Sequence, residues 1–298
     1  MMTKTIYALG FFDGVHRGHA ALLAAARGLA RETGCLAGAV TFLSHPEALL
    51  LGDAPALIKT PEDREALILE YHAMDTLLQL PFDKAMQAMP WESFLQMLID
   101  DHGAAGFVCG DDFRFGHKGQ GNVKLLLDWC RQRDLPCAAV PEQTLHGIRV
   151  SSTHIRSLLE SGDMASAVEF LGHPHILSGT VVSGRKLGRS LGIPTANLRL
   201  PEGVITPRFG VYACRVKIEG KFYAAVTNIG NRPTVGGHRI TVEPWLLDFD
   251  GDLYGKELTL SFHAFLRPEQ KFPSLDALKE EIQKNALQTR KFFENNAK

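Results

Sequence analysis

The first half of the chain alternates between short apolar runs and longer segments rich in helix-forming residues. The apolar runs, which predict strands, cover residues 4–10, 35–43, 75–82, 104–110 and 137–143. The segments between them predict helices over residues 19–34, 62–74, 93–103 and 122–136. Continuous apolar runs are typical of strands that are buried on both faces of a parallel sheet. The alternation therefore predicts βαβ units, and we expect residues 1 to about 155 to form a parallel α/β sheet covered on both faces.

The pattern changes near residue 175 to short alternating runs separated by turn signals such as EGK and DFDGD. These runs cover residues 176–184, 210–230, 240–249 and 257–267. They predict a small antiparallel barrel. A helical pattern with a Ser cap over 274–296 predicts a terminal helix, and residues 154–172 predict a helix that links the two halves. We therefore expect two domains, 1–172 and 173–298.

Composition narrows the class of protein. The chain has 298 residues and a formal net charge of −1, with 45 % hydrophobic and 22 % charged residues. This balance is typical of a soluble globular protein and argues against a nucleic-acid binder, which needs a basic excess. No apolar run approaches the roughly 20 residues that span a bilayer, and the first residues do not resemble a signal peptide, so we expect a cytoplasmic protein. The 5 cysteines form no CxxC pair, which argues against a disulfide framework or a structural zinc site.

The stretch GFFDGVHRGH (10–19) places His16 and His19 between the first predicted strand and the first predicted helix. At this strand–loop–helix position α/β sheets bind anions, because free N–H groups at a helix start carry partial positive charge. Gly10 and Gly14 let the backbone approach a ligand closely. From the local pattern alone two alternatives stay open: a shared zinc ion, for which no third ligand is obvious nearby, and exposed loop histidines without a role.

Two further polar stretches follow predicted strands of the same sheet. GDDFRFGHKGQG (110–121) is rich in Gly and carries cationic side chains, and IRVSSTHIRSLL (148–159) places Ser152 and Thr153 at the start of a helix. Taken singly, the first is also typical of a polar turn and the second of an ordinary Ser/Thr cap. Together with the histidine loop they bring three polar loops to the carboxyl edge of one sheet, where such sheets bind ligands.

The second half carries oxygen donors in place of histidines. In GRSLGIPTANLRLP (188–201), Thr195 and Asn197 alternate and would share one face of an extended chain, as an Mg²⁺ site requires, although a capped turn is the commoner local explanation. Glu243 stands in the otherwise apolar segment TVEPWLLDF. It is a candidate general base, or a solvent-facing residue on an alternating strand.

The set of motifs is more specific than any one of them. FDGVHRGH, GDDFRFG and SSTHIR, in this order and spacing, resemble the nucleotidyltransferase module of the bacterial bifunctional riboflavin kinase/FAD synthetases. The resemblance implies that the phosphate of FMN attacks the α-phosphorus of ATP, giving FAD and pyrophosphate, and that His16 and His19 are the catalytic pair. Other implied ATP and phosphate ligands in this module are Gly10, Phe12, Asp13, Gly14, Asp112, Arg149, Ser152, Thr153 and Arg156. The implied flavin ligands are His45, Pro46, Asp112 and Phe113.

The motifs of the second half are similar to the riboflavin kinase module of the same enzymes. They are GIPTAN, GVY, NIGNRPTV, a Glu before LLDFDGDLYG, and LRPEQKF. The resemblance implies a six-stranded antiparallel barrel with a C-terminal helix, which converts riboflavin and ATP to FMN and ADP. By this pattern Thr195 and Asn197 coordinate Mg²⁺-ATP and Glu243 takes the proton of the riboflavin hydroxyl. The implied residues around the nucleotide phosphates are Gly184, Lys186, Gly192 and Pro194.

Two positions depart from the family pattern. Phe11 stands where the family often has Asn, and Pro244 with Trp245 replaces the usual pair after Glu243. Three other hypotheses therefore stay open: only one module is active, the protein is a flavin- or nucleotide-binding regulator without turnover, or the first module transfers a nucleotide to something other than a flavin. We expect Mg²⁺ as the cofactor and riboflavin, FMN, FAD, ATP, ADP and pyrophosphate as substrates and products. We expect no nucleic acid or membrane partner, and a monomer or weak homo-oligomer.

Overall fold

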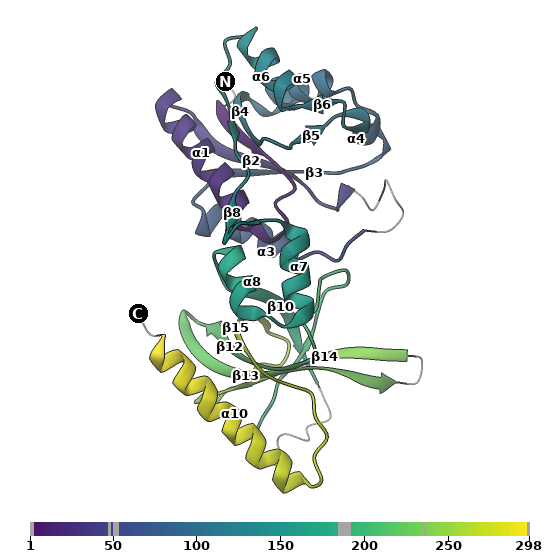
Figure 1. The fold of residues 1–298 in the computed structure, drawn as a ribbon, viewed down its shortest axis with the longest axis vertical. Helices are drawn as coiled ribbons and strands as arrows, with labels where there is room; N and C mark the ends of the chain where they lie inside the picture. Colours follow the sequence, from purple (N-terminus) through teal and green to yellow (C-terminus); the bar gives the residue numbers. More distant parts are fainter. Residues whose placement is uncertain (1–2, 47–48, 50–53, 184–191, 235–236, 297–298) are drawn as a thin grey trace. The chain divides into compact units, whose positions relative to one another are not determined.

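The computed structural model describes the chain except residues 1–2, 47–48, 50–53, 184–191, 235–236 and 297–298 (Figure 1). The chain divides into two compact units, Met1–His154 and Ile155–Lys298, each of which is described by itself below.

The first unit is built on a five-stranded parallel sheet. Its strands are β1 (Thr5–Leu9), β2 (Leu36–Phe42), β3 (Thr76–Leu80), β4 (Ala104–Gly110) and β7 (Cys137–Val140), in the order β3-β2-β1-β4-β7. All neighbouring pairs are parallel, which confirms the predicted sheet. The strand order reverses between β1 and β4, and at such a point two loops diverge to opposite sides and leave a crevice at the carboxyl edge.

Helices cover both faces of this sheet. They are α1 (Arg17–Thr33), α3 (Pro61–Ala66), the continuing π-helical turn η2 (Leu67–Tyr71), α4 (Lys84–Ala88), α5 (Trp91–His102) and α6 (Val123–Arg131). Along β1, Ile6 and Ala8 pack in the core that contains α1, whereas Tyr7 and Leu9 pack in the core that contains α5 and α6. This alternation explains why β1 is buried at every position, since both of its faces are covered.

Short elements complete the first unit. They are η1 (Asp13–Val15), β5 (Arg114–Phe115), η3 (His117–Gly119), β6 (Gly121–Asn122), β8 (Thr144–Leu145) and β9 (Ile148–Arg149). β5 pairs with β6 and β8 with β9, each as an antiparallel hairpin. Both hairpins follow carboxyl ends of sheet strands and carry the polar stretches that the sequence singles out.

The single helix expected over residues 154–172 is wrong, because the structure has two helices there. α7 covers Ser152–Ser161 and α8 covers Met164–Leu171. Gly162 between them has φ +82°, a left-handed conformation that ends a helix and favours glycine. Asp163 then caps α8 by accepting a hydrogen bond from the Ser166 N–H at 3.1 Å.

The second unit is a closed antiparallel barrel with a C-terminal helix, as expected. Its strands are β10 (His175–Val182), β11 (Asn197–Arg199), β12 (Gly210–Ile218), β13 (Lys221–Thr234), β14 (Gly237–Leu246) and β15 (Glu257–Pro268), in the order β10-β11-β14-β13-β12-β15. Helix α10 (Leu275–Asn295) packs against β12 and β13. Its N-cap is Ser274, whose hydroxyl accepts from the Ala277 N–H at 3.1 Å.

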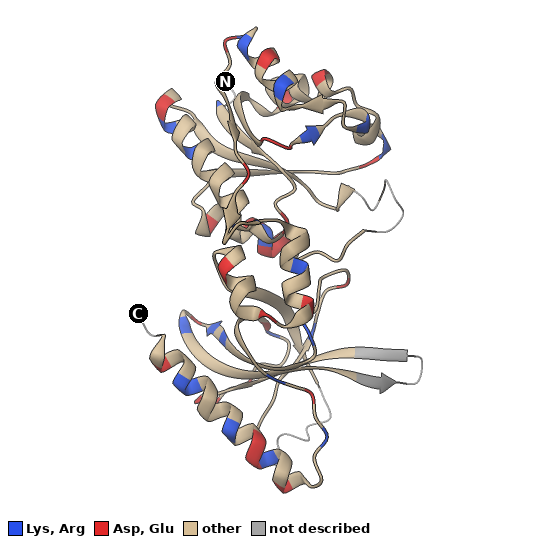
Figure 2. Ribbon diagram, in the orientation of Figure 1, with Lys and Arg blue, Asp and Glu red and all other residues tan. Residues whose placement is uncertain are grey.

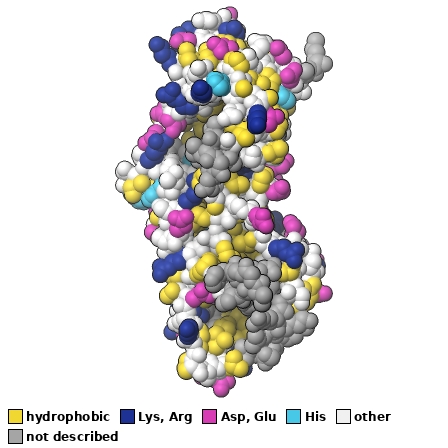
Figure 3. Space-filling view, turned by 90° about the vertical axis from the view of Figure 1, so that its right-hand side faces the viewer, with side chains coloured by type: hydrophobic (Ala, Val, Ile, Leu, Met, Phe, Trp, Pro, Cys, Tyr) yellow, Lys and Arg dark blue, Asp and Glu magenta, His cyan; other side chains and the backbone are white. Residues whose placement is uncertain are grey.

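Charges of both signs are spread over both units. Basic and acidic residues follow one another along α10 (Figure 2). Figure 3 shows the same mixture over the face that it presents, with apolar patches between the charges. Within the described part of the chain, no helix combines the length and apolar character that crossing a membrane requires.

Candidate functional site

The loop between β1 and α1 has an unusual backbone. Phe12, Gly14 and Val15 have φ of +58°, +80° and +45°. Only Gly14 adopts such values at low cost, and for a β-branched residue such as Val15 they are strained. Phe12 and Val15 are fully buried, so the surrounding core holds the loop in this form. Strain of this kind is concentrated at ligand sites, where it fixes the direction of backbone N–H groups.

His16 and His19 lie directly after this loop. Their rings are stacked, with centroids 3.6 Å apart and planes 13° from parallel. His16 is the N-cap of α1, because its Nδ1 accepts from the His19 N–H at 3.3 Å. Burial, and then the neighbouring His16 and Arg64, hold the pKa of His19 well below its usual value. His19 is therefore a neutral imidazole at pH 7, able to donate one ring N–H to an anion.

Asp13 ties the loop to a segment far away in the sequence. Its carboxylate, only 2 % exposed, accepts from the Ile58 N–H at 2.9 Å and from the Lys59 N–H at 3.3 Å. Lys59 is itself fully buried, and burial lowers its pKa to about 7, against the opposing attraction of Asp63 and Asp13. The carbonyl of Asp13 accepts from the Ser152 hydroxyl at 2.9 Å, so the start of α7 joins the same loop.

Arg149 is held by two carboxylates. Its guanidinium donates to Asp112, and its Nε lies 2.9 Å from Glu142 Oε2. All three side chains are exposed, so the network borders solvent at the carboxyl edge of the sheet. The sequence motifs predict Asp112 and Arg149 at one site, whereas no motif points to Glu142.

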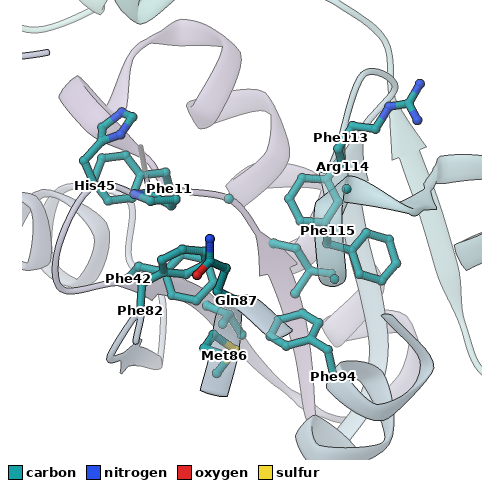
Figure 4. A pocket seen from close by; sticks show the side chains of 16 residues that line it. Phe11, Phe42, His45, Phe82, Met86, Gln87, Phe94, Phe113, Arg114 and Phe115 are labelled. Carbon is teal, nitrogen blue, oxygen red and sulfur yellow. The ribbon is translucent and has the colours of Figure 1, made fainter. Parts of the chain in front are cut away.

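An aromatic cavity of about 470 Å³ opens at the same edge (Figure 4). Phe11 and His45 lie together on one side of it, and Phe113 and Phe115 lie on the other. Its further lining residues include Gly10, Phe42, Pro46, Phe82, Met86, Gln87, Phe94 and Arg114. A pocket of this size with aromatic walls and few polar groups fits a flat ring system.

Two cavities lined by described residues of the barrel share one residue. The larger, about 760 Å³, is lined by Gly192, Pro194 and Thr195 and by the loop after β14, including Asp250 and Asp252. The smaller, about 400 Å³, is lined by Thr195 on one side. Thr195 therefore stands where the two cavities meet.

The lining of the smaller cavity combines Glu243 with several apolar side chains. Glu243 and Trp245 share one face of β14 and both line it, while the intervening Pro244 is buried on the opposite face. The Pro244 carbonyl accepts from the Ala196 N–H at 2.9 Å, so the strand is paired beside the proline. Helix α10 closes the cavity with apolar side chains and with the buried Asn285, which accepts from Arg267 Nε at 3.0 Å.

The remaining site residues from the sequence fall in several places. Asn197 is half-buried at the start of β11, opposite Val182, and is absent from the described linings of both barrel cavities. Thr153 is exposed on α7 and Arg156 is half-buried on the same helix. Gly184 and Lys186 lie outside the described residues. In the part of the chain that is described, no three His, Cys, Asp or Glu side chains are grouped to hold a metal ion.

Fold and cavities together define a class of protein. The first unit has the sheet order and the His-bearing strand–loop–helix of nucleotide-binding α/β domains, and the second is a barrel with two adjoining cavities. This is a two-unit enzyme that handles nucleotide phosphates and a flat aromatic ring.

Comparisons with known proteins identify the family. The FAD synthetase family model matches residues 1–154, and the riboflavin kinase model matches residues 171–293. The bifunctional riboflavin kinase/FMN adenylyltransferase of Bacillus subtilis is 32 % identical over 98 % of this chain and 93 % of that protein. The Pseudomonas fluorescens protein of the same name is 39 % identical over 93 % and 89 %. The chain belongs to the bifunctional riboflavin kinase/FMN adenylyltransferase family, with its synthetase part first and its kinase part second.

A solved structure shares the whole fold. It matches with a TM-score of 0.88 and 29 % identity, covering 97 % of this chain and 94 % of that one. Its title describes a macrolide-efflux protein from Streptococcus pneumoniae. That description belongs to the other protein, whereas the family assignment here rests on the family models and the curated relatives.

Proposed function

We propose that the first unit adenylylates FMN between the histidine loop and the aromatic cavity. The observation that carries this proposal is their shared edge: Gly10 and Phe11 begin the strained loop and also line the cavity. A flavin ring in the cavity would leave its phosphate near the loop, where His16, His19 and the start of α1 bind the ATP phosphates. No protein nucleophile is required, since nucleotidyl transfer depends on positioning and on stabilising charge.

Further residues of the first unit have supporting roles in this proposal. Ser152 fixes the loop through the Asp13 carbonyl, and Thr153 and Arg156 extend the phosphate site along α7. Arg149 and Asp112 form an exposed pair that binds the outer part of the nucleotide. His45, Pro46 and Phe113 bind the flavin, as the sequence predicts, together with aromatic residues that the sequence did not reveal.

The second unit phosphorylates riboflavin in its two adjoining cavities. The flavin lies in the smaller one against Trp245, and Glu243 takes the proton from its 5′-hydroxyl as that oxygen attacks the γ-phosphate. The nucleotide lies in the larger one, beside Gly192 and Pro194. Thr195 stands at the junction, where the transferred phosphate passes.

Mg²⁺ fits the larger cavity, because the polar side chains in its described lining all end in oxygen: Thr195, Asp250, Asp252 and Tyr254. Thr195 and Asn197 would hold it. When bound, Mg²⁺ neutralises the charge of the ATP phosphates and orients them.

We also propose a cellular location, an oligomeric state and a range of partners, each inferred from the sequence. The protein acts in the cytoplasm as a monomer or weak homo-oligomer, with neither nucleic acid nor membrane as a partner. The boundary between its domains at residue 172/173 stays a prediction.

Substitutions in the two flavin cavities test the assignment. Phe113→Ala is expected to raise the KM for FMN in FAD formation about tenfold, through lost ring contact, with riboflavin phosphorylation unchanged. Trp245→Ala is expected to raise the KM for riboflavin and to leave FAD formation from FMN unchanged. If both variants changed the same KM, the assignment of the cavities would be wrong.

A further inference from the structure

Arg64 is a fully buried cation beside the histidine loop. It lies on α3, and its guanidinium donates to the Phe11 carbonyl at 3.1 Å and to the Phe42 carbonyl at 2.6 Å. Burial lowers its pKa, and the attraction of Asp13 and then Glu62 opposes that shift. A buried charge is strongly destabilising unless it is well compensated, so the burial of Arg64 calls for a reason beyond packing.

The guanidinium also holds an aromatic ring in place. It lies 4.6 Å from the centroid of the Phe11 ring, a cation–π distance. The His45 ring meets Phe11 edge-on at 4.6 Å between centroids. The Phe11 carbonyl accepts a further hydrogen bond, from the Thr41 hydroxyl at 2.8 Å. Phe11 is thus fixed both through its backbone and through its ring.

Phe11 and His45 form one wall of the aromatic cavity, whereas Arg64 is not among its described lining residues (Figure 4). Arg64 therefore lies behind the lining, where it contacts the carbonyls of Phe11 and Phe42 and, of these two, the ring of Phe11. At position 11, where the family often has Asn, this chain thus has an aromatic ring with a buried cation over its face.

We propose that Arg64 is a positioning residue for FMN: it holds the Phe11–His45 wall of the cavity in the orientation that stacks on the flavin ring. The inference rests on the proposed function, in which this cavity binds the flavin of FMN. Its consequence is that the affinity for FMN, rather than for ATP, depends on the Arg64–Phe11 contact.

A double-mutant cycle on the full-length chain tests the proposal. Arg64→Lys keeps the charge but cannot reach both carbonyls and the ring, and Phe11→Leu removes the ring but keeps the carbonyl. Each is expected to raise the KM for FMN in FAD formation about tenfold and to leave the KM for ATP within about twofold. The double variant is expected to be no worse than the worse single one, since both remove the same contact.

A matched control uses the other Arg–aromatic contact of this unit. The Arg133 guanidinium lies 4.1 Å from the Trp129 ring and donates to the Trp129 carbonyl at 3.3 Å. Trp129 does not line the described cavity. Arg133→Lys is therefore expected to leave both KM values unchanged. Arg64→Gln serves as a second variant if Arg64→Lys fails to fold, and it too is expected to raise the KM for FMN.

Several results would overturn the proposal. One is an unchanged KM for FMN in the folded Arg64 variants, and another is a KM for ATP that rises as much as the KM for FMN. Fully additive effects of Arg64→Lys and Phe11→Leu would show that they act separately. The proposed function has its own test in Phe113→Ala: if this variant raises the KM for FMN and the Arg64 variants do not, only the inference fails.

Discussion

The two units carry different side chains at their proposed nucleotide sites. The first surrounds its anion loop with the nitrogen groups of His16, His19 and Lys59. The described lining of the larger barrel cavity instead offers oxygen, from Thr195 and two aspartates. Carboxylates repel phosphate unless a cation stands between them, whereas imidazole and ammonium groups bind phosphate directly. We therefore expect riboflavin phosphorylation to depend on Mg²⁺ more strictly than FAD formation does.

The largest expected effect belongs to Glu243. Glu243→Gln keeps the shape of the side chain but removes the base, so riboflavin phosphorylation is expected to fall roughly a thousandfold. FAD formation from supplied FMN is expected to be unchanged, because Glu243 lies in the other unit. Chromatography of the flavins over time measures both rates. A Glu243→Gln enzyme that phosphorylates riboflavin normally would exclude the residue as the base.

Substitution of His16 is expected to have the next largest effect, on FAD formation and not on riboflavin phosphorylation. His16→Ala is expected to lower FAD formation about a hundredfold, as for the loss of one charge-stabilising donor, and to spare FMN formation. His16 also caps α1, so His16→Asn serves as a control that restores the cap without the imidazole. Equal loss of FAD formation in both variants, with better thermal stability in His16→Asn, would separate the two roles. Normal activity in His16→Asn would assign the effect to the cap.

The metal dependence of the barrel provides a third, smaller effect. Thr195→Val removes a hydroxyl at the junction of the cavities and is expected to raise the Mg²⁺ concentration for half-maximal riboflavin phosphorylation about tenfold. Thr195→Ser keeps the hydroxyl and should behave like the natural enzyme. The Mg²⁺ dependence of FAD formation should not move in either variant. A shift in both reactions would contradict the contrast between the units.

The smallest effect concerns stability. The pKa of Lys59 is about 7 in the folded chain, below its ordinary value. Between pH 7 and about 10, Lys59 is therefore largely neutral in the folded chain but protonated in the unfolded chain. The free-energy cost of burying Lys59 is therefore greatest below pH 7, and it decreases as the pH rises. Lys59→Met is expected to raise the melting temperature by about 5 °C at pH 6, with little gain at pH 10. The exposed Lys84, changed to Met, is the control. A gain that is independent of pH would contradict the assigned pKa.

Much of the fold follows from local sequence signals. The strands of the parallel sheet are continuous apolar runs, and β4 begins and ends where the sequence predicts, at Ala104 and Gly110. The sequence predicts a single helix over 154–172 because helix formers stand on both sides of Gly162. In the structure, the left-handed backbone of Gly162 separates α7 from α8. Small elements such as η3 depend on distant contacts, including the hydrogen bond from the His117 N–H to the Met89 carbonyl, and carry little local signal.

The candidate site was predictable in part, for a similar reason. Motif residues such as His16 and Thr195 stand out because glycines and polar groups interrupt an apolar pattern. Phe82 and Phe94 do not stand out, since an aromatic residue that lines a cavity has the same pattern as one that fills a core. Arg64 looks like an exposed helix charge in the sequence EDREA. Its burial comes from carbonyl partners at Phe11 and Phe42, more than twenty residues away.

The most direct test of two independent sites is a mixing experiment. His16→Ala and Glu243→Gln proteins are each incubated with riboflavin, ATP and Mg²⁺, alone and together. Alone, His16→Ala should accumulate FMN and Glu243→Gln should leave riboflavin unchanged; together they should form FAD, because FMN released by one protein is adenylylated by the other. If two folded variants mixed in this way formed no FAD, the two activities would not reside in separate sites.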